Sequence, residues 1–350
     1  MSARPASRRR HDDARRRLLA QITSCWRTQA LRVAVQLDLP DRLAGGPCDA
    51  AGLASACNCP ADALLRLLRA LCALGVCSQR RDGRFVLTRA GASLCREPAD
   101  DGPGLRAMVL WWGGPMWSLW DDLDYSVQTG LSARARRTGN AHYGFLDGRP
   151  DEAALFHEAM RAMTSLVAGD VAALPCWRSA RELVDVGGGH GELAMALAAA
   201  HPALHAIVFD RLDAEPGARA LLARCAVPGR LRFAAGDFFA AVPAGADRYL
   251  LKSILHNWDD EACGRILARC AEAAPAGARL LLVERLRPER LRPTRHDEAL
   301  ARTDLNMLAG LGGRERSLAE FGALLAPAGF EISGVSTTRC EFSVVEARRR

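Results

Sequence analysis

Apolar and polar positions in the second half of the chain predict a parallel sheet covered by helices. Short apolar runs that suit buried strands fall at residues 183–186, 205–210, 231–234, 248–253 and 279–285. Helical patterns separate most of these runs, so the fold class is α/β with a Rossmann-like sheet. Strands covered on both faces lose their polar alternation, as these have. Two further runs at 330–335 and 341–345, joined by a short turn, predict an antiparallel hairpin that finishes the sheet.

The first hundred residues show helical patterns, followed by a small hairpin. Apolar positions recur at helical spacing over 14–36, and two shorter helices follow. Strand-like pieces at 76–79 and 84–88 flank an Asp-Gly turn. This winged-helix pattern places its second helix against DNA in many proteins. Here that helix is leucine-rich and offers only Arg66 and Arg69 to a groove, so we expect it to pack in a dimer interface.

Residues 101–180 connect the two patterns and are predicted to be helical. Tryptophans gather in the first part of this segment, at positions 111, 112, 117 and 120. Flat aromatic side chains either build a core that links the two halves or form a wall against a flat ligand. Both interpretations stay open at this point.

The patterns divide the chain into four ranges, and 350 residues suit more than one domain. We expect a disordered basic tail over 1–13, a winged-helix-like dimerisation domain over 14–100, a helical and substrate-lining segment over 101–180, and a cofactor-binding α/β domain over 181–350.

The net charge of +7 is concentrated at the two ends of the chain. Residues 1–17 hold seven arginines and two aspartates, and residues 348–350 are all arginine, so the body of the chain is close to neutral. Terminal charge runs are usually solvated, and a neutral body disfavours nucleic acid as a partner. The chain has no apolar run of the length of a membrane span or a signal peptide. We therefore expect a cytoplasmic protein with no membrane partner.

The cysteines are numerous and the lysines are rare. The 12 cysteines are scattered and form no C-x-x-C pair, which predicts reduced thiols and no metal cofactor. Among 47 basic residues the one lysine is Lys252, an exception that invites a local explanation.

The segment LVDVGGGHGELAMALAAA combines a buried strand, a glycine-rich loop and a helix. Such a turn brings bare backbone N–H groups and a helix N-terminus up to a ligand. Gly189, Gly191 and Ala194 fit the spacing of a dinucleotide site, so an NAD-dependent dehydrogenase is one alternative. Asp185 argues against it, because a carboxylate two residues before Gly187 repels phosphates. S-adenosylmethionine (SAM) carries a sulfonium and an ammonium group and no phosphate, and it suits this acid better.

Polar residues stand at the carboxyl ends of the next predicted strands, where open α/β sheets bind ligands. Asp210 ends the second strand, where an acid commonly binds ribose hydroxyls. After the third strand, Asp237 is placed to accept from the adenine amino group and Phe238 to pack on the base. Lys252 ends the fourth strand and would lie along the cofactor. Together these residues predict a nucleoside site.

His256 lies in LLKSILHNWDDE, where the fourth strand opens into the next helix. Beside the cofactor it is predicted to act as general base, because its ordinary pKa of about 6.5 leaves much of it neutral near pH 7. A phenol with a pKa of about 10 becomes a good nucleophile only when its proton is removed. Glu284, which ends the fifth strand, and Glu315 in GGRERS are expected to orient the imidazole and stabilise its protonated form.

The string DVGGGHG, FD, GDFF, LKSILHNWDDE, VER and DLNMLAGLGGRERS, followed by EFGALLAPAGF, resembles SAM-dependent O-methyltransferases typified by plant caffeate and bacterial antibiotic-tailoring enzymes. The resemblance covers nearly the whole chain and implies a class I methyltransferase domain, a winged-helix dimerisation domain and a homodimer. It implies that the cofactor contacts Gly187, Asp210, Asp237, Phe238 and Lys252. It also implies that Met160 and Met307 line the acceptor site, where soft side chains suit an aromatic ring.

One departure from the plant members lies directly after the expected base. They usually have His-Asp-Trp, whereas this chain has His256, Asn257 and Trp258. Asn257 keeps a hydrogen-bonding side chain toward the substrate but carries no charge. The expected base, His256, is present, and the chain resembles the bacterial members more than the plant members at this point.

The predicted function is SAM-dependent O-methylation of a hydroxyl on an aromatic secondary metabolite such as a polyketide, phenazine or quinone. One alternative is a SAM-binding relative that performs N- or C-methylation, decarboxylation or hydroxylation. Another is a winged-helix regulator that binds DNA.

Overall fold

The computed structural model describes residues 6–98, 104–140, 142–225, 227 and 229–350. They form two compact units, Met1–Pro115 and Met116–Arg350. The division falls inside the range 101–180 that the sequence pattern treats as one segment. Among the described residues, no helix is both long enough and apolar enough to cross a membrane.

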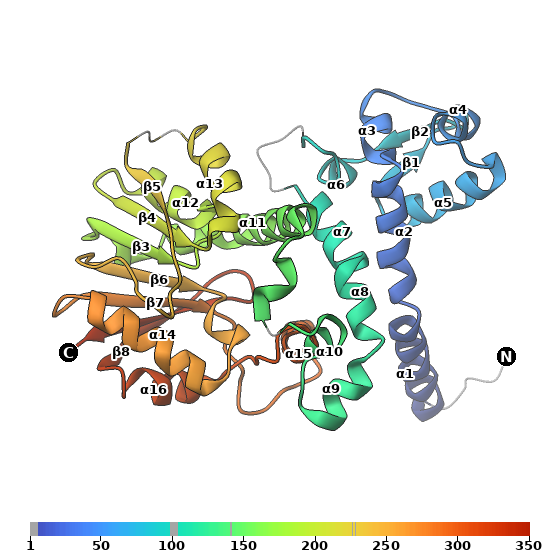
Figure 1. The fold of residues 1–350 in the computed structure, drawn as a ribbon. Coiled ribbons are helices and arrows are strands. Elements are labelled where there is room, and N and C mark those ends of the chain that lie inside the picture. The colour runs from blue at the N-terminus through green and yellow to red at the C-terminus, as the bar shows by residue number, and fades with distance from the viewer. Residues whose placement is uncertain (1–5, 99–103, 141, 226, 228) are drawn as a thin grey trace. The chain divides into compact units, whose positions relative to one another are not determined.

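The second unit is built on a seven-stranded sheet in the order β5-β4-β3-β6-β7-β9-β8, counted over the described residues (Figure 1). Its strands are β3 Glu182–Val186, β4 His205–Asp210, β5 Leu231–Ala235, β6 Arg248–Lys252, β7 Arg279–Glu284, β8 Phe330–Thr337 and β9 Ser343–Arg349. The first five pair in parallel, and β9 pairs antiparallel with both β7 and β8. This confirms the predicted fold class, including the terminal hairpin.

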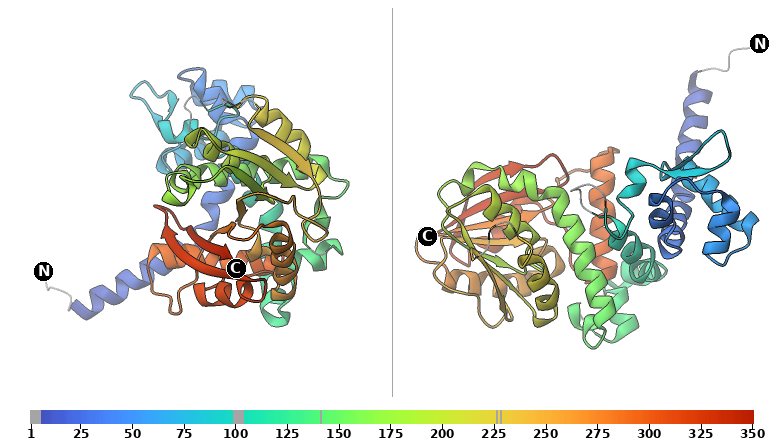
Figure 2. Two further views of the ribbon diagram at one scale, coloured as in Figure 1. Left: turned by 90° about the vertical axis from the view of Figure 1, so that its left-hand side faces the viewer. Right: turned by 90° about the horizontal axis from the view of Figure 1, so that it is seen from above.

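Helices cover both faces of this sheet (Figures 1 and 2). On one face α14 Asp260–Ala273 and α16 Leu318–Leu325 pack against Tyr249 and Leu251. On the other, α11 Pro150–Ala172 and α12 Glu192–Ala200 share a core with Leu250 and Leu281. Successive strand residues point to opposite faces, so an uninterrupted apolar strand serves both cores. Helix α13 Glu215–Leu222 follows β4.

Other helices lie before the sheet or between its strands. They are α8 Pro115–Trp120, α9 Leu123–Thr129, α10 Ala133–Thr138 and α15 Arg295–Gly310, with 3₁₀ turns at His142–Leu146, Pro175–Trp177, Leu212–Ala214 and Leu255–Asn257. Helix α10 packs against α15. The hydroxyl of Ser132, which caps α10, bonds the carbonyl of Gly310 at 2.9 Å. The expected helical character of this region is therefore present.

The first unit has the helix, turn, helix and hairpin pattern. Its elements are α1 Ala6–Ile22, α2 Cys25–Gln36, α3 Leu39–Ala44, α4 Ala50–Ala56, α5 Ala61–Ala73, β1 Cys77–Gln79, β2 Phe85–Leu87, α6 Arg89–Ala92 and α7 Arg106–Gly113. Leu64, Leu68 and Leu71 place one face of α5 in the core. Arg66 and Arg69 lie on its exposed face.

The N-terminal segment differs from the expected tail and from the expected single helix. Helix α1 begins at Ala6, so residues 6–13 are helical, while residues 1–5 lie outside the described residues. Arginine is a good helix former, and this run leads directly into the apolar positions of the same helix. The pattern over 14–36 is divided, since α1 ends at Ile22 and α2 begins at Cys25.

Candidate active site

The glycine loop joins β3 to α12 in backbone conformations that other residues rarely adopt. Gly187, Gly189 and Gly191 have φ of +72°, +57° and +88°. A β-carbon on Gly187 would lie 2.4 Å from Cδ1 of Ile254, and one on Gly191 would lie 2.7 Å from Cγ2 of Val208. Gly187 and Gly191 therefore require glycine for both conformation and space, and Gly189 for conformation alone. The strand order reverses between β3 and β6, so the loop opens at the switch point where α/β sheets bind ligands.

Asp185 lies directly beneath this loop. Its side chain is buried, and a β-carbon on Gly188 would lie 2.8 Å from its Cγ. Burial, reinforced by the Asp210 carboxylate, raises the pKa of Asp185 to about 7, and nearby Lys252 opposes the shift. Its Oδ2 atom is buried and has no hydrogen-bond partner among the described residues. A buried acceptor of this kind needs a donor, and a cationic ammonium group fits it.

The acids after β4 and β5 occupy different environments. Asp210 accepts hydrogen bonds from the backbone N–H groups of Gly189 at 2.6 Å and Arg211 at 2.7 Å, which ties β4 to the glycine loop. Asp237 is exposed, and its Oδ1 accepts from the N–H of Phe239 at 2.8 Å. The ring of Phe238 lies half-buried beside Phe239, with the two ring centres 5.0 Å apart. The predicted nucleoside residues thus line the same edge of the sheet.

Lys252 ends β6 at the switch point. Its Nζ lies 5.2 Å from the ring centre of Phe342, whose other close cation is Arg285 at 4.1 Å. Burial and the Arg285 guanidinium together lower the pKa of Lys252 to about 8, against the opposing effect of the Glu284 and Asp185 carboxylates. Because β6 lies between β3 and β7, the lysine lies between the strand of Asp185 and the strand of Glu284.

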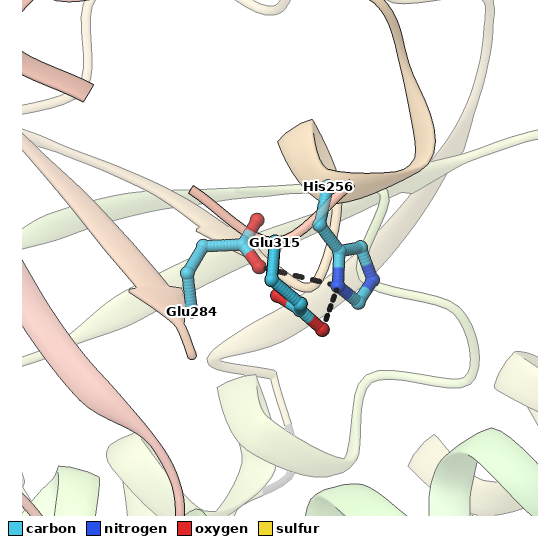
Figure 3. A group of neighbouring side chains, drawn as sticks. All are labelled: His256, Glu284 and Glu315. Carbon is cyan, nitrogen blue, oxygen red and sulfur yellow. Dashed lines mark hydrogen bonds and ion pairs between the residues drawn. The ribbon is translucent and has the colours of Figure 1, made fainter. Parts of the chain in front are cut away.

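His256, Glu284 and Glu315 meet in one buried group (Figure 3). Nδ1 of His256 lies 3.2 Å from Oε1 of Glu315 and 3.7 Å from Oε2 of Glu284. The second oxygen of Glu284 accepts from the backbone N–H groups of Ile254 and Leu255 at 3.1 and 3.0 Å. Glu284 thus fixes the turn that carries the histidine, and Glu315 holds the ring. With Nδ1 engaged as a donor, Nε2 is the nitrogen left to accept a proton.

The charges in this group favour the protonated histidine. Burial alone would lower the pKa of His256, but the Glu284 and Glu315 carboxylates outweigh it, so that the pKa is raised. Burial raises the pKa of Glu284 as well, and the charge of Glu315 adds to that effect. A proton accepted by His256 is therefore held by an adjacent negative charge.

Two neighbours of Glu315 support the histidine turn and were not predicted from the sequence. Arg316 is fully buried and donates to the carbonyl oxygens of Leu255 and Trp258, both at 2.7 Å. Gly313 lies so close that a β-carbon would sit 2.0 Å from the His256 carbonyl oxygen. The Gly-Gly pair in GLGGRERS is the one local sequence signal for this close approach.

The three residues expected at the acceptor are Asn257, Met160 and Met307. Asn257 is buried, and its amide donates to the carbonyl of Ser253 at 2.9 Å, a bond within its own turn. Met160 on α11 and Met307 on α15 are half-buried. Their contact with an acceptor stays a prediction.

The geometry of the histidine group also bears on metal binding. Ligand atoms of His256, Glu284 and Glu315 lie within 4.8 Å of one another, a spacing that would admit a metal ion. The sequence predicted no metal, and that stays a prediction.

Comparison with known proteins identifies the family. A family model for the O-methyltransferase domain matches residues 120–331, and one for the O-methyltransferase dimerisation domain matches residues 19–97. The phenazine O-methyltransferase of Lysobacter antibioticus is 35% identical over 331 residues, which cover 95% of each chain. The O-demethylpuromycin O-methyltransferase of Streptomyces alboniger is 36% identical over 99% of this chain and 92% of its own.

A solved structure extends the likeness to the fold. The O-methyltransferase from neocarzinostatin biosynthesis, in complex with SAM and 2-hydroxy-5-methyl naphthoic acid, matches with a TM-score of 0.75 at 34% identity. The match covers 92% of this chain and 96% of that chain.

The chain belongs to the O-methyltransferase family. It is a SAM-dependent O-methyltransferase, and the two relatives named above are a phenazine and an O-demethylpuromycin O-methyltransferase. The residues at the sheet edge fit the cofactor, because the glycine loop leaves its backbone bare and Asp185 keeps an unpartnered acceptor for a cation. The predicted dimerisation domain is confirmed by the family match.

Proposed function

We propose that this enzyme methylates a hydroxyl group on an aromatic secondary metabolite, with His256 as general base. The observation that carries the proposal is the buried contact between His256 Nδ1 and Glu315 at 3.2 Å, at the edge of the sheet that holds the glycine loop. Relatives named for phenazine and O-demethylpuromycin support an aromatic acceptor of this kind.

His256 removes the acceptor proton through Nε2 while Nδ1 stays bonded to Glu315. The raised pKa makes His256 a stronger base than an ordinary histidine, and the carboxylate stabilises the imidazolium that forms. Glu284 keeps the turn in place through its two backbone hydrogen bonds. Since a phenol is a weak nucleophile until it loses its proton, this transfer is the step that the protein must assist.

The cofactor supplies an electrophilic methyl group on a sulfonium sulfur. Asp185 would bind its ammonium group, Gly187 and Gly189 would approach it with bare backbone, and Asp210 would accept from ribose. Asp237, Phe238 and Lys252 complete the proposed cofactor set. The protein assists the methyl transfer itself by alignment, because binding holds the acceptor oxygen close to the methyl carbon.

The active form is proposed to be a homodimer. In the first unit, Leu18, Leu19, Ile22 and Trp26 are 57%, 60%, 65% and 71% exposed on α1 and α2. Large apolar side chains gathered in this way mark interaction surfaces, and the family match assigns dimerisation to residues 19–97.

We also propose that the enzyme acts in the cytoplasm and binds neither nucleic acid nor membrane. A DNA-binding role for α5 would show as retention in a mobility-shift assay, with affinity that falls steeply with salt. Absence of retention at low salt removes that alternative.

Product analysis tests the proposed function. Purified enzyme is incubated with SAM and a panel of hydroxylated phenazines, naphthoates and quinones, each paired with its amino analogue. The expected product gains one methyl group on oxygen, located by mass spectrometry and NMR. Methylation of the amino analogues alone, or on carbon, would contradict the proposal.

A further inference from the structure

Tyr143 packs beside Trp258, close to the turn that carries His256. It belongs to the 3₁₀ turn His142–Leu146, which precedes α11. Its ring centre lies 6.2 Å from that of Trp258, two residues after His256, and 5.8 Å from that of Phe156 on α11. The ring therefore contacts both the catalytic turn and the helix expected to line the acceptor.

Carboxylates from two strand ends act on the Tyr143 hydroxyl. Burial raises its pKa, and the carboxylates of Asp210 and Glu284 raise it further, against the charges of Arg134 and Arg211. Asp210 ends β4 and Glu284 ends β7, with β3 and β6 between them. At about 4.8 Å for each strand spacing, the two strand ends are about 14 Å apart. The ring contacts agree with a place near these strand ends, because the ring centre of Trp258 lies 6.2 Å from that of Tyr143 and 5.9 Å from that of Phe238, which follows β5.

The hydroxyl is available to a bound molecule. It forms no hydrogen bond with any residue of the described ranges, and its oxygen is not among the fully covered polar atoms. Tyr249 is different, because its hydroxyl donates to the carbonyl of Ala273 at 2.8 Å inside the core.

We propose that Tyr143 aligns the acceptor by donating a hydrogen bond from its hydroxyl to the oxygen that receives the methyl group. This inference rests on the proposed function. As the acceptor O–H bond breaks, its proton passes to Nε2 of His256. An oxygen lone pair forms the bond to the methyl carbon, and the electron pair of the broken carbon–sulfur bond stays on the sulfur. Tyr143 keeps its own proton throughout.

The geometry explains why a second contact is needed beside the base. An acceptor oxygen held by His256 alone can rotate about that one hydrogen bond. A donor on its other side fixes the direction of the remaining lone pair, and orientation of this kind is a large part of enzymatic rate enhancement. A hydroxyl with a raised pKa stays a donor over the working range of pH.

The test is Tyr143→Phe, which removes one oxygen and keeps the ring packing. We expect kcat/KM to fall about 10- to 100-fold, the loss that follows removal of a hydrogen bond to a developing charge. The Kd for SAM is expected to stay within about twofold, because the hydroxyl acts on the acceptor. The loss is expected to be larger for a weakly acidic phenol than for one already ionised at the assay pH.

The chain offers two matched controls, because it has three tyrosines. Tyr125→Phe removes a hydroxyl on α9, where the ring packs against Arg136, and is expected to leave both activity and melting temperature unchanged. Tyr249→Phe removes a core hydrogen bond and is expected to lower the melting temperature without changing the dependence on acceptor acidity.

Three outcomes overturn the inference. A Tyr143→Phe variant with kcat/KM within twofold of wild type shows that the hydroxyl does not align the acceptor. A loss of SAM affinity as large as the loss of kcat/KM shows that Tyr143 acts on the cofactor instead. If the wild-type enzyme itself methylates no hydroxylated acceptor, the proposed function fails and this inference fails with it.

Discussion

Gly313 touches the main chain of His256. A β-carbon on Gly313 would lie 2.0 Å from the His256 carbonyl oxygen and 2.6 Å from the carbonyl carbon of Asn257. The next residue, Arg314, donates its N–H to the same His256 oxygen at 2.8 Å. The segment that supplies Glu315 is therefore held against the turn that supplies the base.

Gly313→Ala should displace this turn. We expect kcat to fall on the order of 100-fold, because a shift of about 1 Å in a catalytic group has that effect, while SAM affinity changes little. Gly264→Ala is the matched control, since it lies in α14 with no atom within 4 Å of the added carbon. Steady-state kinetics and SAM-binding measurements are made on both variants. Unchanged turnover in Gly313→Ala would show that the contact does not position His256.

The pH profile reports the charge around His256. A general base works in its neutral form, so kcat/KM should fall as pH drops through a pKa above the ordinary value of about 6.5. Glu315→Gln removes one carboxylate and should move this midpoint to lower pH while lowering the maximum rate. Glu331→Gln, in an exposed pair with Arg350, is the control and should leave the profile unchanged. A midpoint that does not move in Glu315→Gln contradicts the electrostatic role.

Asp185 should control affinity for the cationic cofactor. Asp185→Asn is expected to weaken SAM binding about 10- to 100-fold, the effect of losing a hydrogen bond between charged groups. In the wild type, affinity should fall as pH drops below about 7, because protonation of Asp185 removes its charge. The variant should show no such dependence, and Asp82→Asn, an exposed residue of the first unit, should behave as wild type. Calorimetric titrations between pH 5.5 and 8.5 distinguish these outcomes.

Arg316 is expected to stabilise the folded protein. Arg316→Met leaves the carbonyls of Leu255 and Trp258 without their buried donor, which should cost about 3 kcal/mol in the free energy of unfolding. Arg314→Met breaks exposed pairs with Asp260 and Glu320 and should change it by less than about 1 kcal/mol. Urea denaturation compares the two variants. Equal losses in the free energy of unfolding would contradict the buried role assigned to Arg316.

Metal removal should leave activity unchanged. The acids around His256 are engaged in orienting the ring and the backbone, so we expect dialysis against a chelator to preserve kcat. Loss of activity that a divalent cation restores would assign a metal to His256, Glu284 and Glu315 instead.

Local patterns were sufficient to predict the sheet. Each strand of the second unit lies within a few residues of its predicted range, and His205–Asp210 agrees at both ends, because apolar runs and strand-end acids are local signals. The group of His256, Glu284 and Glu315 followed from strand ends and from the family resemblance.

Other features depend on contacts that a linear pattern does not contain. Tyr143 meets Trp258 across more than a hundred residues, and nothing in HYGFLDG marks it as part of the site. The buried role of Arg316 was hidden because arginines occur throughout the chain. The basic segment from Ala6 was expected to be disordered from its charge, whereas the structure continues α1 through it.

His256 as general base is tested most directly by the rate of methyl transfer in His256→Ala, measured in a single turnover with SAM already bound. A general-base role of His256 predicts a loss of at least about 100-fold with a SAM Kd within about twofold of wild type, since general-base catalysis contributes about 10²- to 10⁴-fold. It also predicts a smaller loss for acceptors that are ionised at the assay pH. A wild-type rate with un-ionised phenols would contradict the assignment of His256 as the base.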